Sequence, residues 1–125
     1  VATYTRTLDL SRLGPDLRPR SLSFVSPAVG RITIRFTWNP RAHRSLTRKT
    51  AEDGAYFFSL ARDDGAVRVR GRMVANSEDM LASARAGDPT LPPGTLACVG
   101  LRDPQRYDLS DGTCKIVYTE VTPDA

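Results

Sequence analysis

Arginine side chains recur at alternate positions in two short segments of the sequence. Arg31 and Arg35 alternate with apolar residues in the first segment, and Arg68, Arg70 and Arg72 do so in the second. The guanidinium group is a planar fork of N–H donors that matches phosphate and carboxylate groups. The two segments therefore predict a cationic patch that could hold a polyanion by charge, without reading nucleic-acid bases.

A polar stretch in the middle of the sequence adds further basic side chains. Its apolar positions are too irregular for a helix, so we expect a long basic loop that carries Arg41, Arg44, Arg48 and Lys49. The alternative for the whole basic set is a solvated outer face, because sandwich strands point polar side chains outward. The net charge is +4, and all but two of the 18 basic residues are arginine. A coding bias toward arginine could also produce this composition, so the charge permits both interpretations.

The sequence lacks the patterns that are typical of enzymes. His43 is the single histidine, and no serine or cysteine lies in a nucleophile motif such as G-x-S-x-G. The neighbouring carboxylates Asp63 and Asp64 are expected at a hairpin tip, where glycoside chemistry would have no cleft. We therefore expect a protein without enzymatic activity and without a cofactor.

Three aspartates near the end of the chain could supply oxygen ligands for calcium. Asp103, Asp108 and Asp111 lie close together and are followed by Gly112. Their spacing does not match an EF-hand loop, and aspartate before proline or glycine is typical of turns. We expect turns and no metal site.

Two cysteines, Cys98 and Cys114, are too few for a disulfide scaffold and lack the spacing of a zinc or redox motif. They could form one disulfide if the strands that carry them pair. The alternative is a pair of small buried thiols, which are common in protein cores. No apolar run approaches the roughly 18 residues of a membrane span, so no membrane insertion is expected.

Strands must position these side chains, because a period of two is the period of a strand. In the first arginine segment Ile32, Ile34, Phe36 and Trp38 should be buried, and in the second segment Val67, Val69 and Met73 should be buried. Predicted strands cover residues 2–10, 21–25, 31–38, 56–60, 66–74, 96–101 and 113–121. Asp63-Asp64-Gly65 is expected to close a hairpin. Polar and acidic residues from position 76 predict one short helix near 77–86.

Seven short strands and one short helix predict an all-β fold, an antiparallel β-sandwich with jelly-roll character. The chain has 125 residues, of which 40% are hydrophobic and 26% are charged. These values are typical of a globular protein that can bury a core without metals or disulfides. Residues 1–125 are therefore expected to form a single domain.

Two stretches resemble strands of small viral coat jelly rolls. In residues 22–36 a strand ends at Pro27 and Gly30 opens the next, as in the paired early strands of those domains, and residues 112–123 resemble their closing strand. The resemblance implies a capsid or capsid-protrusion domain in the virion, in contact with copies of itself or neighbouring subunits. Its arginines would meet acidic partner surfaces or genome phosphates. Coat proteins usually carry a basic arm ahead of the jelly roll, and a full shell domain is usually longer than this chain, so its length fits a protruding or accessory domain better.

A second resemblance leaves an alternative open. Residues 91–95, Leu-Pro-Pro-Gly-Thr, precede a predicted strand and are similar to a feature of secreted bacterial sandwich modules that are appended to enzymes. That resemblance implies a secreted accessory module that binds a glycan or a protein through its loops. An oxidised pair of Cys98 and Cys114 would favour this alternative.

Overall fold

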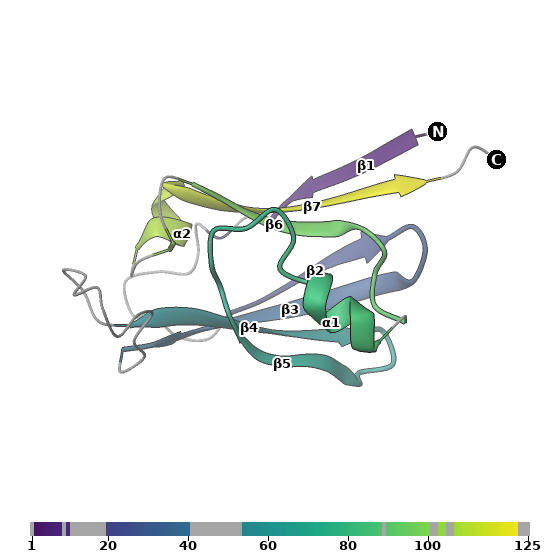
Figure 1. Ribbon diagram of the computed structural model, residues 1–125, viewed down its shortest axis with the longest axis horizontal. Coiled ribbons are helices and arrows are strands. Elements are labelled where there is room, and N and C mark those ends of the chain that lie inside the picture. The colour runs from purple at the N-terminus through teal and green to yellow at the C-terminus, as the bar shows by residue number, and fades with distance from the viewer. Residues whose placement is uncertain are drawn as a thin grey trace.

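Seven strands and two short helices make up the described part of the chain (Figure 1). The computed structural model describes residues 2–8, 10, 20–40, 54–88, 90–100, 103–104 and 107–122. In chain order the elements are β1 (Ala2–Thr7), β2 (Arg20–Ser26), β3 (Gly30–Asn39), β4 (Ala55–Arg62), β5 (Val67–Met73), α1 (Ala82–Gly87), β6 (Thr95–Gly100), α2 (Asp108–Asp111) and β7 (Cys114–Thr122).

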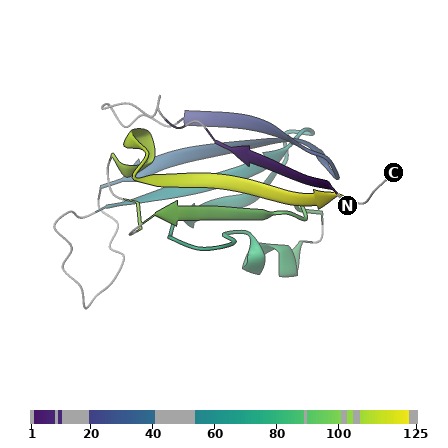
Figure 2. The same ribbon diagram turned by 90° about the horizontal axis from the view of Figure 1, so that it is seen from above.

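The strands form two antiparallel sheets that lie face to face (Figures 1 and 2). One sheet has the order β1-β7-β6, and the other has the order β2-β3-β4-β5. This confirms the predicted all-β antiparallel sandwich. The four-stranded sheet follows chain order as a meander, so its connections are simpler than the paired Greek keys of a jelly roll.

The inner faces of both sheets form one hydrophobic core. Ile32, Ile34 and Phe36 on β3 are completely buried, as their alternation with polar residues predicted. The other sheet contributes Tyr118, whose ring lies 4.7 Å from that of Phe24 on β2, measured between centroids. The core therefore extends across the space between the sheets.

The predicted hairpin joins β4 to β5. The N–H of Gly65 donates to the carbonyl of Arg62 at 2.9 Å, and the carboxylate of Asp64 accepts the N–H of Ala66 at 2.9 Å. Gly65 has a φ of +80°, a conformation that glycine adopts without strain. The turn chemistry that the sequence predicted is confirmed.

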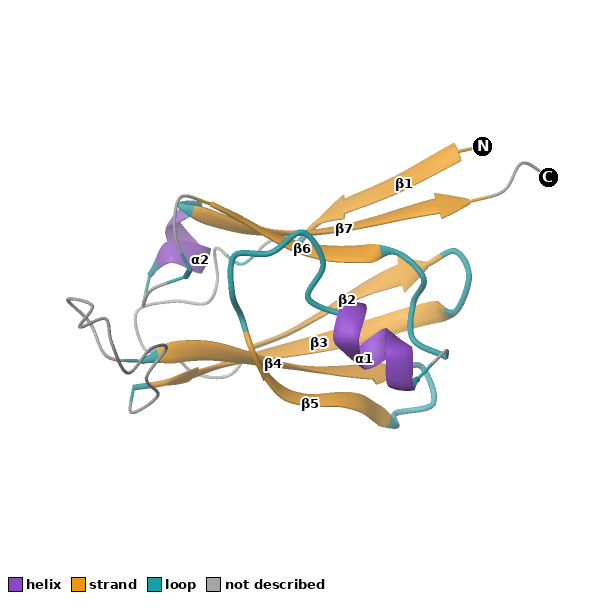
Figure 3. Cartoon of the chain, viewed as in Figure 1, coloured by secondary structure: helices purple, strands orange, loops and turns teal. Residues whose placement is uncertain are grey.

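The first helix begins later than the sequence predicted. We expected it near 77–86, whereas α1 spans Ala82–Gly87 (Figure 3). The reason is that the preceding polar residues bind β6 instead of capping a helix. Ser77 exchanges two backbone hydrogen bonds with Cys98, and the carboxylate of Asp79 accepts a backbone N–H at the start of β6. The second helix, α2, was not predicted and lies in the segment that we expected to be turns.

Candidate anion-binding surface

β3 presents its two arginines on the outer face of the four-stranded sheet. Arg31 and Arg35 are exposed, while Ile32 and Ile34 beside them have no exposed surface. Successive side chains of a strand point to opposite faces, so burial of the isoleucines fixes the arginines outside. The predicted orientation of this segment is confirmed.

β5 does not continue this pattern, because its pairing with β4 changes register. From Val69 to Arg72, β5 advances three residues while β4 advances two, so Arg70 and Gly71 share one partner position. This extra residue is a β-bulge, which shifts the alternation of the strand that contains it. Gly71 has a φ of +55°, which places glycine at the bend.

The predicted buried face of β5 is therefore wrong in part. Val69 is buried at 3% exposure, but Val67, which we expected beside it, is 38% exposed, and Met73 is half-buried. A further register shift separates Val67 from Val69. Two irregularities in one short strand explain why strict alternation fails there.

The three arginines of β5 have different surroundings. Arg68 forms an ion pair with Asp64 at 3.3 Å between Nη2 and Oδ2. Arg72 donates from Nη1 to Oγ of Ser83 on α1 at 2.8 Å. Arg70 is exposed and lies at the bulge beside Ser59, which occupies an outward position of β4. Of the β5 arginines, Arg70 is the one that joins those of β3.

We call the outer surface that carries Arg31, Arg35 and Arg70 the arginine face. Arg35 lies opposite Ser59 on β4, and the bulge at Arg70 lies on the other side of Ser59. Arg35 and Arg70 are therefore two strand spacings apart, about 10 Å, and Arg31 is about 13 Å along β3 from Arg35. Such spacing suits an extended anionic surface more than a single phosphate.

Most side chains around the arginine face are uncharged, although the Asp63 carboxylate lies against Gly30 at one end of it. The outward positions of β2, β3 and β4 between and beside the arginines hold Ser21, Ser23, Val25, Thr33, Thr37, Phe57, Ser59 and Ala61. Within the described ranges, no ion pair involves Arg31, Arg35 or Arg70.

The predicted basic loop lies outside the part of the chain that the structure describes. Its basic residues are Arg41, His43, Arg44, Arg48 and Lys49. The arginine face is accordingly defined by β3 and β5 alone.

The outer surface of the three-stranded sheet has the opposite character. We call it the threonine face, and it consists of Thr3, Thr5 and Thr7 on β1, Thr95, Ala97 and Val99 on β6, and Lys115, Val117, Thr119 and Val121 on β7. In the centre, Thr5, Thr119 and Thr95 lie side by side in register. Lys115 is the one charged residue of this set.

A buried carboxylate links the two sheets. Glu120 on β7 is 2% exposed. Its Oε1 accepts hydrogen bonds from the hydroxyls of Ser26 on β2, at 2.6 Å, and Tyr118, at 2.5 Å. Its Oε2 accepts the N–H of Ala28 at 3.0 Å, and the Tyr118 oxygen accepts the N–H of Gly94 at 3.0 Å. We call Ser26, Tyr118 and Glu120 the buried cluster.

The buried cluster has residue types that can transfer protons, but its geometry is that of a structural link. Burial, and then the hydrogen bond to Glu120, raise the pKa of Tyr118 to about 12, so its hydroxyl keeps its proton near neutral pH. The polar side-chain atoms of the cluster are already hydrogen-bonded to one another or to the backbone. Sequence reasoning missed this cluster, although the alternation of β7 continues from Ile116 through Tyr118 to Glu120 and would have placed Glu120 inside.

The two cysteines lie on paired strands but form no disulfide. Both are buried thiols. Cys98 lies opposite Ile116, and Cys114 lies opposite Gly100, so the cysteines are diagonal neighbours. Diagonal Cα atoms in a sheet are about 7–8 Å apart, which exceeds the usual Cα separation in disulfides. The possible bond between them is therefore absent, and both side chains fill the core.

The three aspartates that could bind calcium lie in separate contacts. The carboxylate of Asp103 accepts the N–H of Asn76 at 2.7 Å, and that of Asp111 accepts the N–H of Thr113 at 2.8 Å. Asp108 is buried at the start of α2. In the part of the chain that the structure describes, no group of three histidine, cysteine, aspartate or glutamate side chains could hold a metal ion.

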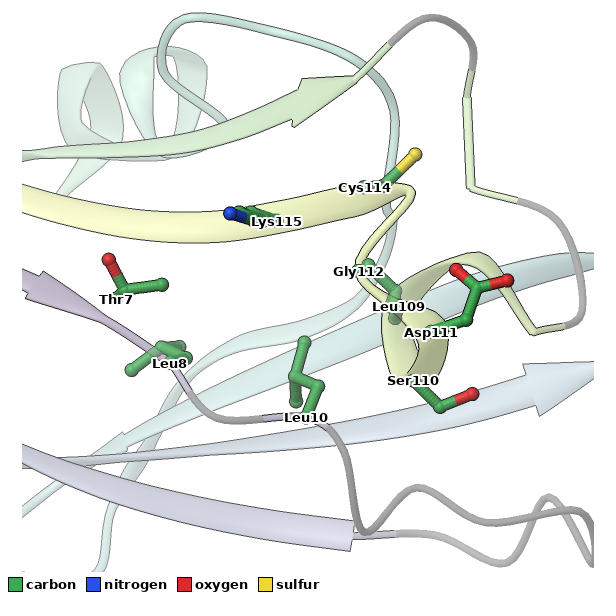
Figure 4. Close-up of a pocket in the computed structure, with 9 residues that line it drawn as sticks. All are labelled: Thr7, Leu8, Leu10, Leu109, Ser110, Asp111, Gly112, Cys114 and Lys115. Carbon is green, nitrogen blue, oxygen red and sulfur yellow. The ribbon is translucent and has the colours of Figure 1, made fainter.

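An open cavity of about 330 Å³ lies between the end of β1 and α2 (Figure 4). Leu8, Leu10 and Leu109 give it an apolar lining, beside Ser110 and Asp111. Cys114 and Lys115 also line it, and the Asp111 carboxylate accepts the Thr113 N–H. Among the helices of the described residues, none is long and apolar enough to cross a membrane.

Comparison with known proteins assigns no family to the chain. No family model matches it, and neither a curated protein nor a solved structure matches it.

Proposed function

We propose that this domain is a non-enzymatic structural module that contacts copies of itself or neighbouring subunits and meets an anionic surface with its arginine face. The observation that carries the proposal is the separation of charge between the two outer faces. Arg31, Arg35 and Arg70 lie on one face, with no ion pair among the described residues, and the other face is almost uncharged. Surfaces divided in this way are suited to oriented contacts with different partners.

The interior supports a structural role. Ser26, Tyr118 and Glu120 bond to one another across the sheets, which stabilises the sandwich and leaves no reactive group aimed at solvent. The cavity beside α2 is open, and leucines line it together with polar residues that include Asp111 and Lys115. An enzyme would need a nucleophile, a base and a binding cleft at one place, and the described residues bring no such set together.

A viral capsid or capsid protrusion is the assembly that fits the sequence resemblance. In such a setting the domain belongs to the virion. Its arginine face meets either an acidic surface of a neighbouring subunit or the phosphates of the genome, through charge and without sequence specificity.

Salt-dependent binding to a polyanion tests the arginine face. A fluorescent single-stranded oligonucleotide serves as the probe, and its affinity for the wild-type chain should fall linearly with salt on logarithmic axes. The triple variant Arg31→Ser/Arg35→Ser/Arg70→Ser should lower that slope by about 2, because each phosphate contact on a single strand contributes about 0.7.

A matched control distinguishes binding by the arginine face from binding by the net charge of the protein. The variant Arg20→Ser/Arg68→Ser/Arg72→Ser removes the same three charges from positions outside the arginine face. It should retain most of the affinity and of the slope. Equal losses in both triple variants would show that net charge alone binds the probe, and the proposal would then be wrong.

A further inference from the structure

β1 is an open edge of the three-stranded sheet. It pairs on one side with β7, and within the described residues no strand pairs with its other side (Figures 1 and 2). The N–H of Leu8 donates to the carbonyl of Ile116 at 2.9 Å, which identifies the even-numbered residues as those bonded to β7. The backbone N–H and C=O groups of Thr3, Thr5 and Thr7 consequently point away from β7, toward the open edge.

The other sheet edges are less suited to pairing with another strand. Ser77 bridges to the edge of β6, where the N–H of Met80 also donates to the carbonyl of Leu96 at 2.7 Å. β5 has two register shifts, and bulges twist an edge away from a regular partner. β2 lies beside β3, so joining two copies there would place Arg31 and Arg35 of both on one continuous face. β1 combines a regular ladder with an uncharged outer face.

We propose that the open edge of β1 binds β1 of a second copy of this chain, antiparallel about a two-fold axis at Thr5. The inference rests on the proposed function as an assembly module and names the surface that joins two copies. In this register Thr5 lies opposite Thr5 of the other copy, and Thr3 lies opposite Thr7. Each outward N–H and C=O of the three threonines then has a partner, and two three-stranded sheets become one sheet of six strands.

The side chains of β1 favour this register on both faces. On the outer side, threonines meet threonines, which are favourable cross-strand pairs, and the two threonine faces become one continuous surface that carries only Lys115 of each copy as a charged residue. On the inner side, Tyr4 of each copy lies opposite Arg6 of the other, where a guanidinium can contact an aromatic ring. A shift of two residues in one direction would instead set the two Arg6 side chains against each other, and in the other direction it would remove the pairing of Tyr4 with Arg6.

The contact is small, and we therefore expect a concentration-dependent dimer. β1 has six residues, so two paired β1 strands bury less than the roughly 1,200 Å² that is typical of stable complexes. Weak pairing of this kind suits a module that assembles through several contacts at once.

Sedimentation equilibrium over a concentration series tests the inference on the 125-residue chain. The weight-average mass should rise from 13.7 kDa toward twice that value as concentration increases. The variant Thr5→Pro removes an N–H that faces the open edge and spares the bonds to β7, so its mass should stay at 13.7 kDa. The variant Thr5→Val keeps that N–H and should dimerise like the wild type. Circular dichroism serves as the control that each variant is folded.

Charge substitutions test the register, and they do not depend on how proline is tolerated. Thr5→Lys and Thr5→Glu each place like charges directly opposite one another across the two-fold axis, so each alone should dimerise about fivefold more weakly. An equimolar mixture of the two should recover dimerisation as a mixed dimer. High salt should restore the Thr5→Lys dimer in part, because salt screens exposed charges.

Three results would overturn the inference: a wild-type chain that stays monomeric into the millimolar range, a folded Thr5→Pro variant that dimerises as strongly as the wild type, or a mixture that shows no recovery. The proposed function has a separate readout. A monomeric wild type that still binds the oligonucleotide through the arginine face would overturn the β1 dimer alone. A dimer that binds no polyanion would overturn the role of the arginine face alone.

Discussion

The arginine face and the threonine face are built on the same backbone pattern but have opposite chemistry. In β3, Ile32 and Ile34 are buried and Arg31 and Arg35 are outside; in β7, Ile116 is buried and Val117 lies outside. Burial fixes which positions face outward in both sheets, but it does not fix which residue types stand there. The fold therefore does not dictate the difference in residue types between the two faces. For that reason these outer residues are the ones to test for a function.

The two sheets also differ in regularity. β7 pairs with β1 and β6 without a register shift, whereas β5 shifts twice against β4. A regular ladder keeps its outward side chains in straight rows, and a bulged one turns some of them aside. This is why Thr5, Thr119 and Thr95 form a row while the arginines of β5 do not.

The largest effect should come from breaking the link that joins the two sheets. Glu120→Ala leaves the hydroxyls of Ser26 and Tyr118 and the N–H of Ala28 without their acceptor inside the protein. We expect the free energy of unfolding in urea to fall by about 3 kcal/mol, because buried donors that lose their partner are costly. The control Glu78→Ala removes an exposed carboxylate and should change it by less than about 0.5 kcal/mol. A Glu120→Ala variant as stable as Glu78→Ala would contradict the structural role of the buried cluster.

The irregularity of β5 can be tested by a pair of glycine substitutions. Gly71 and Gly87 both have open space where a Cβ would lie, but Gly71 has a φ of +55°. Gly71→Ala should therefore lower the free energy of unfolding by about 1–2 kcal/mol, since an L side chain is strained in the left-handed region. Gly87→Ala should not lower it. Equal changes in the free energy of unfolding in the two variants would show that the positive φ of Gly71 does not hold the bulge.

The regular strands could be predicted from the sequence, and the irregular one could not. Ile32, Ile34 and Phe36 alternate with polar residues, and one buried face explains the whole of β3. In β5 the same reasoning assigned Val67 to the core, because alternation assumes a regular ladder. An isolated glycine inside a strand pattern, here Gly71, is a signal for a bulge that was available and was not used.

Two features of the site depend on contacts that are distant in the sequence. The buried cluster joins Ser26 to Glu120, and nothing local to either residue indicates the other. The start of α1 was misplaced for the same reason, since Ser77 pairs with Cys98 instead of beginning a helix. Alternation predicts which face a side chain occupies, but not which partner it meets there.

The raised pKa of Tyr118 predicts a loss of stability at alkaline pH. In the unfolded chain this hydroxyl ionises near its ordinary pKa of 10.0, whereas burial and the bond to Glu120 raise the value to about 12 in the folded protein. The contribution of this pKa difference to the free energy of unfolding is complete below pH 10. It is lost as the pH rises toward 12, because the unfolded state then releases a proton that the folded state keeps. Tyr118→Phe should flatten the dependence of urea stability on pH in this window. The exposed Tyr107→Phe controls for the loss of one hydroxyl, and a wild type whose stability stays constant over the window would contradict the prediction.

The smallest effects should distinguish the three arginines of β5 from one another. Arg72→Ser removes the hydrogen bond to Ser83 that connects β5 with α1, so it should lower the melting temperature most. Arg68→Ser removes the exposed ion pair with Asp64, and its smaller effect should vanish in 1 M salt because salt screens such pairs. Arg70→Ser should leave the melting temperature unchanged, since no structural contact depends on it among the described residues, yet it should weaken oligonucleotide binding more than the other two. If Arg70→Ser destabilised the fold and left binding intact, Arg70 would belong to the framework of the sheet, and the arginine face would reduce to the two arginines of β3.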